Sequence, residues 1–565
     1  MTDYDLLITG GTVVDGTGAP GVRADVAVVD GTVVAVGDVH GTARTTIDAT
    51  GRVVCPGFVD IHTHYDAQVV WDPLLSCSPW HGVTTVLIGS CGFGVAPTRP
   101  EHRDTVMRTL EKVEGMSYDA LHAGLGDTWP FETFPEYLDV LEGRGTLVNV
   151  AAYVGHTPLR LFVMGPDATE RAAHPDEVAR MQELVAEAVE AGAIGFSTSH
   201  AATHHGAGGR PVPSRLSTFD EVDALVGTAA SHGARLVQAA MGRGFFNDEF
   251  VTLADRHDVT ITWTALLASM AGPGSHLRYL AAAREQQAAG RRIVPQVACR
   301  PIMFDFHFAE PYPFEMLPSF GEVMVADRDR TTAIYRDPEF RAAFRAETAV
   351  DSRNVNAEWW TRTVVSRHDP DPSLEERSVA ELAAERGVHP VDLVLDLALA
   401  DGLRTRFRYA FLNHQADEVR ELISDPATVV TLSDAGAHAD QLCDACWSTH
   451  LLGHWVREQG AMSLEQAVHA LTLRPAELAG LTDRGLLAVG RPADLVVLDP
   501  DTVGATAPRR VADLPGGAER LVTDPIGIDA VVVNGVVVRD RSGDLVTADD
   551  PLPGALLRHG HAGQV

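Results

Sequence analysis

The stretch VVCPGFVDIHTH, residues 53–64, ends in two histidines one residue apart, His62 and His64. Its apolar, β-branched composition and its bounding turn residues predict a buried strand. Residues i and i+2 of a strand point to the same face, so both imidazoles are predicted to project into one cavity. Imidazole is the commonest metal ligand, and two converging copies favour a Zn²⁺ site. Because the chain has 24 histidines, the pair alone is a weak signal.

Strand and helix patterns alternate through the middle of the chain. Amphipathic runs at 176–191 and 219–231 predict helices. Seven further apolar runs predict strands: 84–88, 147–153, 193–197, 235–239, 259–264, 407–412 and 428–432. About eight strand–helix units predict an α/β fold, a parallel (β/α)₈ TIM-like barrel, whose chemistry lies at the C-terminal ends of its strands. His62 and His64 are predicted to lie at that end of the first strand.

The two ends of the chain are β-rich, with glycine-rich turns between short strands. They predict one small β-sandwich domain, built from residues 1–57 and 486–565 around a barrel at 58–485. A proline- and aromatic-rich insertion at about 300–371 interrupts the barrel pattern. This insertion is either a lid over the site or an ordinary subdomain.

Charge and composition narrow the function classes. The net charge of −32 argues against nucleic acid as a partner, because phosphates need a basic face. No run reaches the ~18 apolar residues of a membrane helix, and the start MTDYD lacks the features of a signal peptide. We therefore expect a cytoplasmic protein that acts on a small molecule, with a homo-oligomer possible. Six cysteines are too few for a disulfide scaffold, and the CDAC motif at 443–446 has no second pair to complete a Cys₄ zinc site.

Taken together, these motifs resemble the amidohydrolase superfamily and, within it, the N-acyl-D-amino-acid deacylase (D-aminoacylase) family. The resemblance spans nearly the whole chain. It rests on motifs in order: LLITGG at 6–11, VVDG at 13–16, PGFVD at 56–60, HTH at 62–64, GVTT at 82–85, SCGFGVAP at 90–97, VGH at 154–156, GAIGFST at 192–198, SD at 433–434 and GRPADL at 490–495.

The resemblance implies a metal-dependent hydrolase of a carbon–nitrogen amide bond, most directly a deacylase of N-acyl-D-amino acids. The family's metal-lining residues match His62, His64, Cys91 and Asp434. The implied cofactor is one Zn²⁺ ion, with other divalent metals possible. Asp434 would also be the general base and then acid, taking a proton from metal-activated water and returning it to the leaving nitrogen. Its alternative role is that of a helix N-cap.

Two features of the family are missing. Relatives carry a histidine at the ends of strands five and six, where this sequence has Gln238 and either Thr262 or Thr264. No bridging lysine is evident on strand four. A two-metal site is therefore not expected. A histidine from a loop could supply a missing ligand, and the candidates are His200, His204, His205, His414 and His438.

Four other residues are candidates for the site. His156, at the end of strand three, is a predicted catalytic residue that would hydrogen-bond the carbonyl or its oxyanion. Arg300 and Arg215 are predicted to bind the substrate carboxylate, and His438 is a third predicted substrate contact. Two other functions stay open: a cyclic amide, imide or lactone hydrolase on the same barrel, and a non-hydrolytic binding barrel with a degenerate metal site.

Overall fold

The computed structural model describes residues 2–349 and 358–559. The chain forms two compact units. The first comprises Met1–Arg300, Gln415–Ala439 and Cys443–Val565, and the second comprises Pro301–His414 and Asp440–Leu442. The first unit contains both the barrel and the small β domain, and the exact boundary between those two stays a prediction.

Eight parallel strands confirm the TIM-like barrel. In sheet order they are β6 (Phe58–Asp60), β7 (Val83–Ile88), β8 (Asn149–Gly155), β9 (Gly195–Ser199), β10 (Leu236–Ala240), β11 (Thr260–Thr264), β12 (Ile293–Val297) and β16 (Val429–Val430). A parallel bridge between Thr63 and Ala435 joins the first and last strands just beyond their C-terminal ends. The loops that follow β6 and β16 are thereby brought side by side.

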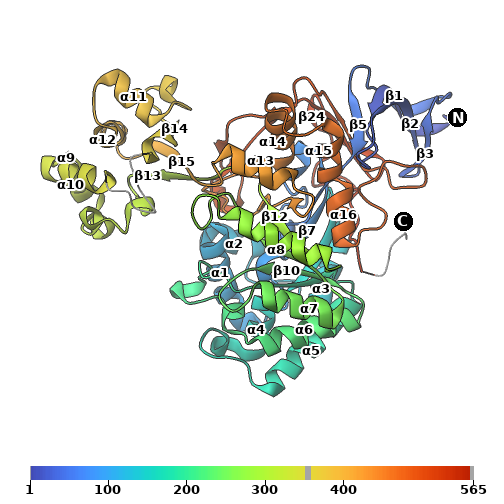
Figure 1. The fold of residues 1–565 in the computed structure, drawn as a ribbon, viewed down its shortest axis with the longest axis horizontal. Helices are drawn as coiled ribbons and strands as arrows, with labels where there is room; N and C mark the ends of the chain where they lie inside the picture. The colour runs from blue at the N-terminus through green and yellow to red at the C-terminus, as the bar shows by residue number, and fades with distance from the viewer. Residues whose placement is uncertain (1, 350–357, 560–565) are drawn as a thin grey trace. The chain divides into compact units, whose positions relative to one another are not determined.

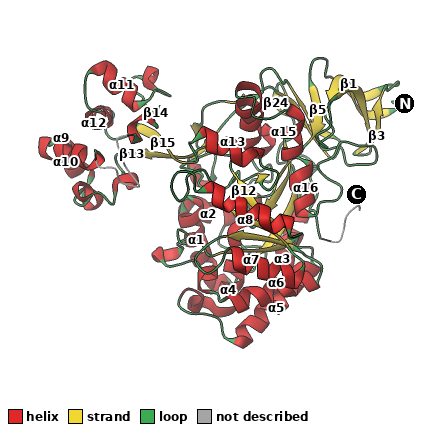
Figure 2. Ribbon diagram, in the orientation of Figure 1, coloured by secondary structure: helices red, strands yellow, loops and turns green. Residues whose placement is uncertain are grey.

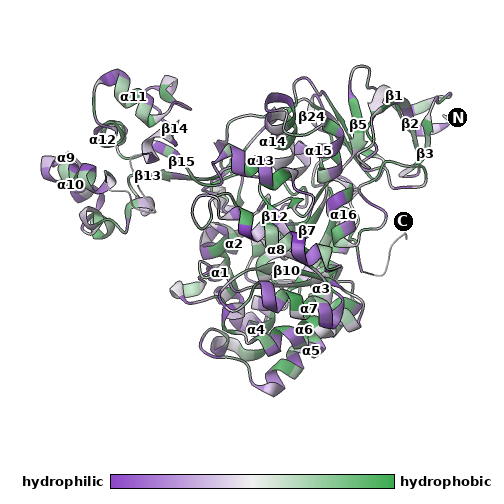
Figure 3. Ribbon diagram, viewed as in Figure 1, coloured by the Kyte–Doolittle hydropathy of each residue, from purple (hydrophilic) through white to green (hydrophobic). Residues whose placement is uncertain are grey.

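Helices cover the outside of this barrel (Figures 1 and 2). The helix α5 buries Met181, Leu184, Val185 and Ala188, the spacing of one apolar helical face. Both predicted helices are confirmed as α5 and α6, and Figure 3 shows apolar strands beneath helices of mixed hydropathy. The helices of this unit are α1 (Arg103–Glu114), α2 (Tyr118–Leu125), α3 (Phe134–Arg144), α4 (His156–Met164), α5 (Pro175–Glu190), α6 (Phe219–Ser231), α7 (Asn247–His257), α8 (His276–Ala288), α13 (Ala416–Ser424), α14 (Trp447–His450), α15 (Leu464–Leu471) and α16 (Leu473–Ala479).

The small β domain is built from both ends of the chain, as predicted. The pairing of β5 with β17 joins the two ends, and Figure 1 shows the N-terminal strands beside C-terminal segments. Its nine-stranded sheet contains β1 (Tyr4–Val13), β2 (Val22–Val29), β3 (Thr32–Gly37), β4 (Ala43–Asp48), β5 (Val53–Pro56), β17 (Leu495–Leu498), β22 (Ile528–Val533), β23 (Val536–Asp540) and β24 (Gly543–Asp544).

The stretch 53–64 is two short strands, not the single strand that the sequence predicts. It divides at Gly57: β5 belongs to the small β domain and β6 opens the barrel. A Cβ atom at Gly57 would lie 2.0 Å from Oγ1 of Thr84, so this crossing point accepts only glycine. His62 and His64 consequently lie in the loop that follows β6.

The predicted barrel strand at 407–412 is wrong. It is β15 (Arg406–Leu412), which pairs antiparallel with β13 (Ile302–His307) and β14 (Thr363–Arg367) in the second unit. The barrel's seventh strand is β12 instead. The hydropathy of a short apolar run does not show which other strands it pairs with, which explains the error.

The second unit extends to His414, well beyond the insertion predicted at 300–371. It has a hydrophobic core of its own, with Phe314, Phe344 and Trp359 among its buried side chains. Its helices are α9 (Arg328–Arg336), α10 (Pro338–Thr348), α11 (Val379–Arg386) and α12 (Pro390–Ala400).

Candidate metal centre

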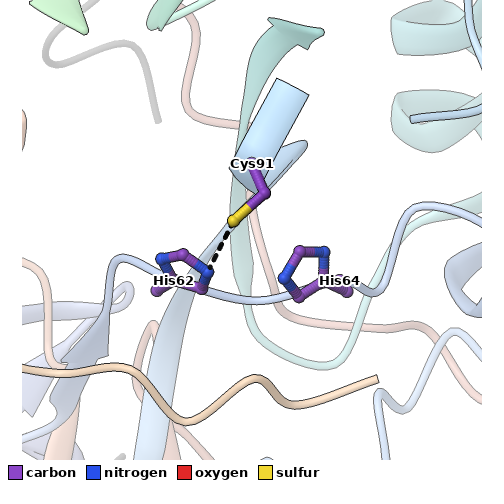
Figure 4. Close-up of side chains that lie close together, drawn as sticks. All are labelled: His62, His64 and Cys91. Carbon is purple, nitrogen blue, oxygen red and sulfur yellow. Dashed lines mark hydrogen bonds between the residues drawn. The ribbon is translucent and has the colours of Figure 1, made fainter. Parts of the chain in front are cut away.

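Two adjacent barrel loops bring His62, His64 and Cys91 together (Figure 4). The histidines follow β6, and Cys91 lies in the short helix η3 (Ser90–Gly92) that follows β7. Their ligand atoms all lie within 4.8 Å of one another, and the three side chains are buried. Nε2 of His62 lies 3.5 Å from Sγ of Cys91.

Asp434 completes this group from the loop after β16. Its Oδ1 lies 3.2 Å from Nε2 of His62 and 3.6 Å from Nε2 of His64. A tetrahedral Zn²⁺ ion with bonds of ~2.0 Å to nitrogen and ~2.3 Å to sulfur separates its ligand atoms by roughly 3.3 to 3.6 Å. The separations from His62 to Cys91 and from the two histidines to Asp434 lie close to these values, and nitrogen, sulfur and oxygen donors are all zinc ligands, so these side chains fit a zinc ion in their chemistry.

Two side chains that the sequence reading did not assign to the site turn the histidines toward it. Oε1 of Gln296, on β12, lies 2.6 Å from Nδ1 of His62. Oε1 of Glu114, the last residue of α1, lies 3.1 Å from Nδ1 of His64. At His62 this acceptor holds the proton on Nδ1, which leaves the Nε2 lone pair for a metal. The contact between His64 and Glu114 is an ion pair without hydrogen-bond geometry. No local motif marks either residue, since each reaches its histidine only through the fold.

The charges of this group are strongly coupled. Burial alone would lower the pKa of His62, but the Cys91 thiolate and the Asp434 carboxylate raise it to about 10. Burial would raise the pKa of Cys91, but His62 and His64 lower it to about 7. Burial likewise opposes ionisation of Asp434, yet the same two histidines hold its pKa well below the usual range. The site thus favours anionic thiolate and carboxylate groups, the forms that bind metals.

Hydrogen-bonding side chains occupy the two strand positions at which the family resemblance implies further histidines. Gln238, on β10, accepts a hydrogen bond from the backbone N–H of Cys91 at 2.5 Å. Thr264, on β11, has its Oγ1 3.7 Å from Sγ of Cys91, and Thr262 lies 3.2 Å from Nε2 of Gln296. These residues hold Cys91 and Gln296 in position.

His156 lies at the start of α4, outside the group formed by His62, His64 and Cys91. Its Nδ1 lies 2.9 Å from Oγ1 of Thr198 and its Nε2 lies 2.8 Å from Oε1 of Glu221. Glu221 also pairs with Arg160, and all three ionisable side chains are buried. Burial lowers the pKa of His156 although Glu221 opposes this. Both ring nitrogens have protein partners, and a direct role for His156 in catalysis stays a prediction.

The three predicted substrate contacts have different surroundings. Arg300 is buried, with its Nε 2.8 Å from Oδ1 of Asp444 and an Nη 2.8 Å from Sγ of Cys446. Arg215 is half-buried in η7 (Pro213–Leu216) and donates to the carbonyl oxygen of His204 at 2.9 Å. His438 is half-buried in the loop that carries Asp434. Their roles in binding substrate stay predictions.

Among the remaining histidines, His204 has the clearest hydrogen-bond partner near the metal centre. Oγ of Ser199 accepts the backbone N–H of Ala201 and lies 2.7 Å from Nδ1 of His204. The serine hydroxyl and the imidazole are therefore joined by a hydrogen bond at Nδ1. Burial, aided by the charge of His64, lowers the pKa of His204 to about 4, so the ring is neutral.

The other three candidate histidines have different surroundings. His200 has its Nε2 3.1 Å from Oγ of Ser217, and His205 is exposed. His414 follows β15, not a barrel strand, and is hydrogen-bonded to Arg362 within the second unit. His414 was a candidate ligand on the expectation that residues 407–412 form a barrel strand, and that expectation is wrong.

Within the described parts of the chain, no helix is both long and apolar enough to cross a membrane.

The barrel, the small β domain and the His-x-His, Cys and Asp set define a class of protein. The profile of the amidohydrolase family matches residues 45–539, and the chain belongs to this family. It is a D-aminoacylase-like hydrolase that acts on carbon–nitrogen bonds.

Known proteins resemble it over almost the full length. The D-aminoacylase of Alcaligenes xylosoxydans xylosoxydans is 31% identical, over 95% of this chain and 94% of its own. A solved D-aminoacylase described as having a binuclear metal centre is 27% identical with a TM-score of 0.65, covering 98% and 100% of the two chains. The N-acyl-D-glutamate deacylase of Bordetella bronchiseptica, solved with zinc and a phosphonate inhibitor, is 28% identical with a TM-score of 0.65, covering 98% and 99%.

Proposed function

We propose that this amidohydrolase removes the acyl group from N-acyl-D-amino acids with the help of one zinc ion. His62, His64, Cys91 and Asp434 would hold the ion. The observation that carries the proposal is the meeting of His62, His64 and Cys91 within 4.8 Å of one another, with the Asp434 carboxylate 3.2 and 3.6 Å from the two histidines. The substrate class is supported by the relatives, which are named as a D-aminoacylase and an N-acyl-D-glutamate deacylase.

A single ion is the form that this donor set favours. The strands β10 and β11 carry no histidine, and their Gln238 and Thr264 side chains are directed at Cys91 instead. Neither an amide nor a neutral hydroxyl is a strong zinc ligand. A bound zinc ion would supply a Lewis acid for the scissile carbonyl and would lower the pKa of water toward ~7.

Asp434 has the geometry for the proton transfers. Its side chain is about a quarter exposed, whereas the side chains of His62 and His64 are almost fully buried, so it is the group that a substrate can reach. It would take a proton from the attacking water as the carbon–oxygen bond forms. It would then deliver that proton to the amide nitrogen as the carbon–nitrogen bond breaks. The products are a carboxylic acid and a free D-amino acid.

The substrate carboxylate needs a cationic partner, and we assign that role first to Arg215. Its element, η7, follows the loop after β9, and its hydrogen bond to His204 ties it to a ring close to the metal centre. A guanidinium can bind a carboxylate through two parallel hydrogen bonds. Arg300 is the second candidate, although its pairing with Asp444 already balances its charge. His438 would contact the same part of the substrate.

The test combines metal analysis with a hydrolysis screen. Purified protein is expected to hold about one zinc per chain and to cleave N-acyl-D-amino acids in preference to N-acyl-L-amino acids and cyclic amides. His62→Ala should remove both the metal and the activity. Turnover of cyclic compounds alone would replace the deacylase assignment by that of a cyclic amidase. Activity that survives chelators and His62→Ala would refute the zinc site.

A further inference from the structure

The first cysteine of the CDAC motif at 443–446 has a partner from a distant part of the chain. Sγ of Cys443 lies 3.8 Å from Sγ of Cys77, at a sequence separation of 366 residues. Both side chains are buried and both thiols are free. The metal centre uses neither of them. Since the sequence has no second CxxC pair, only the tertiary structure could reveal this partner.

The second cysteine of the motif has other contacts. Sγ of Cys446 donates a hydrogen bond to the carbonyl oxygen of Cys443 at 3.5 Å and accepts one from an Nη of Arg300 at 2.8 Å. Among the described residues, no third ligand atom lies near enough to Cys77 and Cys443 to make a metal site with them. The geometry therefore favours a bond between Cys77 and Cys443 over a CxxC disulfide and over a bound metal.

The two sulfur atoms need only a small movement to become bonded. A disulfide bond is ~2.05 Å long, so Sγ of Cys77 and Sγ of Cys443 must approach by roughly 1.8 Å. Neither cysteine lies in a helix or a strand. Rotation of the two side chains and small shifts of their loops can therefore bring the sulfurs together without breaking a strand pairing.

The surroundings of the pair stabilise one thiolate. The hydrogen bond with Cys443 and the guanidinium of Arg520 lower the pKa of Cys77, although burial opposes this. Arg520 donates to the carbonyl oxygen of Ser76 at 2.6 Å, which holds its positive charge close to Cys77. The hydrogen bond with Cys77 raises the pKa of Cys443, so Cys443 stays a neutral thiol. A thiolate in contact with a thiol is the arrangement from which oxidation leads to a disulfide.

We propose that Cys77 and Cys443 form a reversible disulfide when the protein meets hydrogen peroxide. The Cys77 thiolate attacks one peroxide oxygen, the oxygen–oxygen bond breaks, and the products are a sulfenic acid and hydroxide. The Cys443 sulfur then attacks the Cys77 sulfur, and its proton leaves with the departing hydroxyl as water. The hydroxide of the first step takes the proton that Cys77 had released. Two thiols are thus oxidised while one peroxide is reduced to two molecules of water.

This bond links the two segments between which the barrel closes. Cys77 follows the first barrel strand, β6, and Cys443 follows the last, β16. The parallel bridge between Thr63 and Ala435 joins the same two segments without a covalent bond. A disulfide between residues so far apart in sequence restricts the unfolded chain strongly. We therefore expect the oxidised protein to unfold at a temperature about 5 °C higher than the reduced protein.

The first experiment treats the zinc-loaded protein with hydrogen peroxide and maps its peptides without reduction. We expect a peptide pair joined through Cys77 and Cys443 and a loss of two of the six free thiols, both reversed by a dithiol. A bond between Cys443 and Cys446 would overturn the proposal. So would the recovery of Cys77 and Cys443 as free thiols after treatment with an excess of peroxide.

The second experiment measures thermal unfolding before and after oxidation. Cys443→Ala should abolish the shift in unfolding temperature, whereas Cys446→Ala, the matched control from the same motif, should keep it. Cys77→Ala repeats the test from the other side of the bond. A shift of equal size in Cys443→Ala and in Cys77→Ala would trace it to another cysteine and refute the closure of the barrel by this bond. The peptide map of the wild type tests the bond itself even if a variant folds poorly.

Discussion

The amide of Gln296 offers the sharpest test of how this site presents its metal ligands. Gln296 is fully buried and its Oε1 lies 2.6 Å from Nδ1 of His62. Gln296→Leu removes that acceptor. The buried Nδ1–H group then either stays unpartnered, at a cost of about 1–3 kcal/mol, or moves its proton to Nε2, where it blocks the metal-binding lone pair. Removing a partner of this kind typically lowers metal affinity 10–100-fold, or about 1.4–2.7 kcal/mol.

The assay is a competition for zinc against a chromophoric chelator, with thermal unfolding of the metal-free protein measured beside it. Gln296→Glu keeps an acceptor near Nδ1 and should retain most of the affinity. Thr262→Val is the matched control, because it removes the other partner of Gln296 and leaves the contact with His62 in place. Zinc affinity in Gln296→Leu equal to that of the wild type would refute the reasoning. A loss of affinity as large in Thr262→Val would point to packing of β11 and β12, not to the imidazole proton.

Three further changes test other parts of the structure. In steady-state kinetics, Asp434→Asn should lower kcat by about 10²–10⁴-fold and change KM less. An unchanged kcat would show that Asp434 does not carry out the proton transfers. Glu221→Gln leaves the buried guanidinium of Arg160 without its counter-charge. It should lower the free energy of unfolding, measured in urea, by about 3–5 kcal/mol. A loss below ~1 kcal/mol would mean that water replaces the lost carboxylate as a partner of Arg160. Burial lowers the pKa of His81 to about 3. The unfolded chain therefore binds a proton at this residue near pH ~6.5, whereas the folded chain does not. The free energy of unfolding consequently falls as the pH drops below that value. The wild type should lose about 1.4 kcal/mol per pH unit between pH ~6 and ~4 relative to His81→Gln, and parallel curves for the two proteins would contradict this.

The sequence predicted the candidate ligands that lie in short motifs, and the structure brings them close together. His62 and His64 follow an apolar run with one residue between them, and Cys91 follows the next strand. The C-terminal ends of the strands of a (β/α)₈ barrel lie at one end of the barrel, so all three side chains are expected there. The prediction was wrong where an apolar run had to be assigned to one of several sheets. Residues 407–412 read as a strand, correctly, but their hydropathy could not reveal that β13 and β14 were their partners. The break at Gly57 was missed for a similar reason, since its cause is the side chain of Thr84 in the neighbouring strand.

The barrel, the two β-rich ends and the identity of the candidate donors are properties of the sequence itself. They follow from local periodicity and from residue types at fixed spacing, which fold into the same elements wherever the chain goes. The tertiary structure alone decided which side chains orient those donors. Glu114 and Gln296 contact the two histidines from a helix end and from the seventh strand, at sequence separations that no local pattern spans.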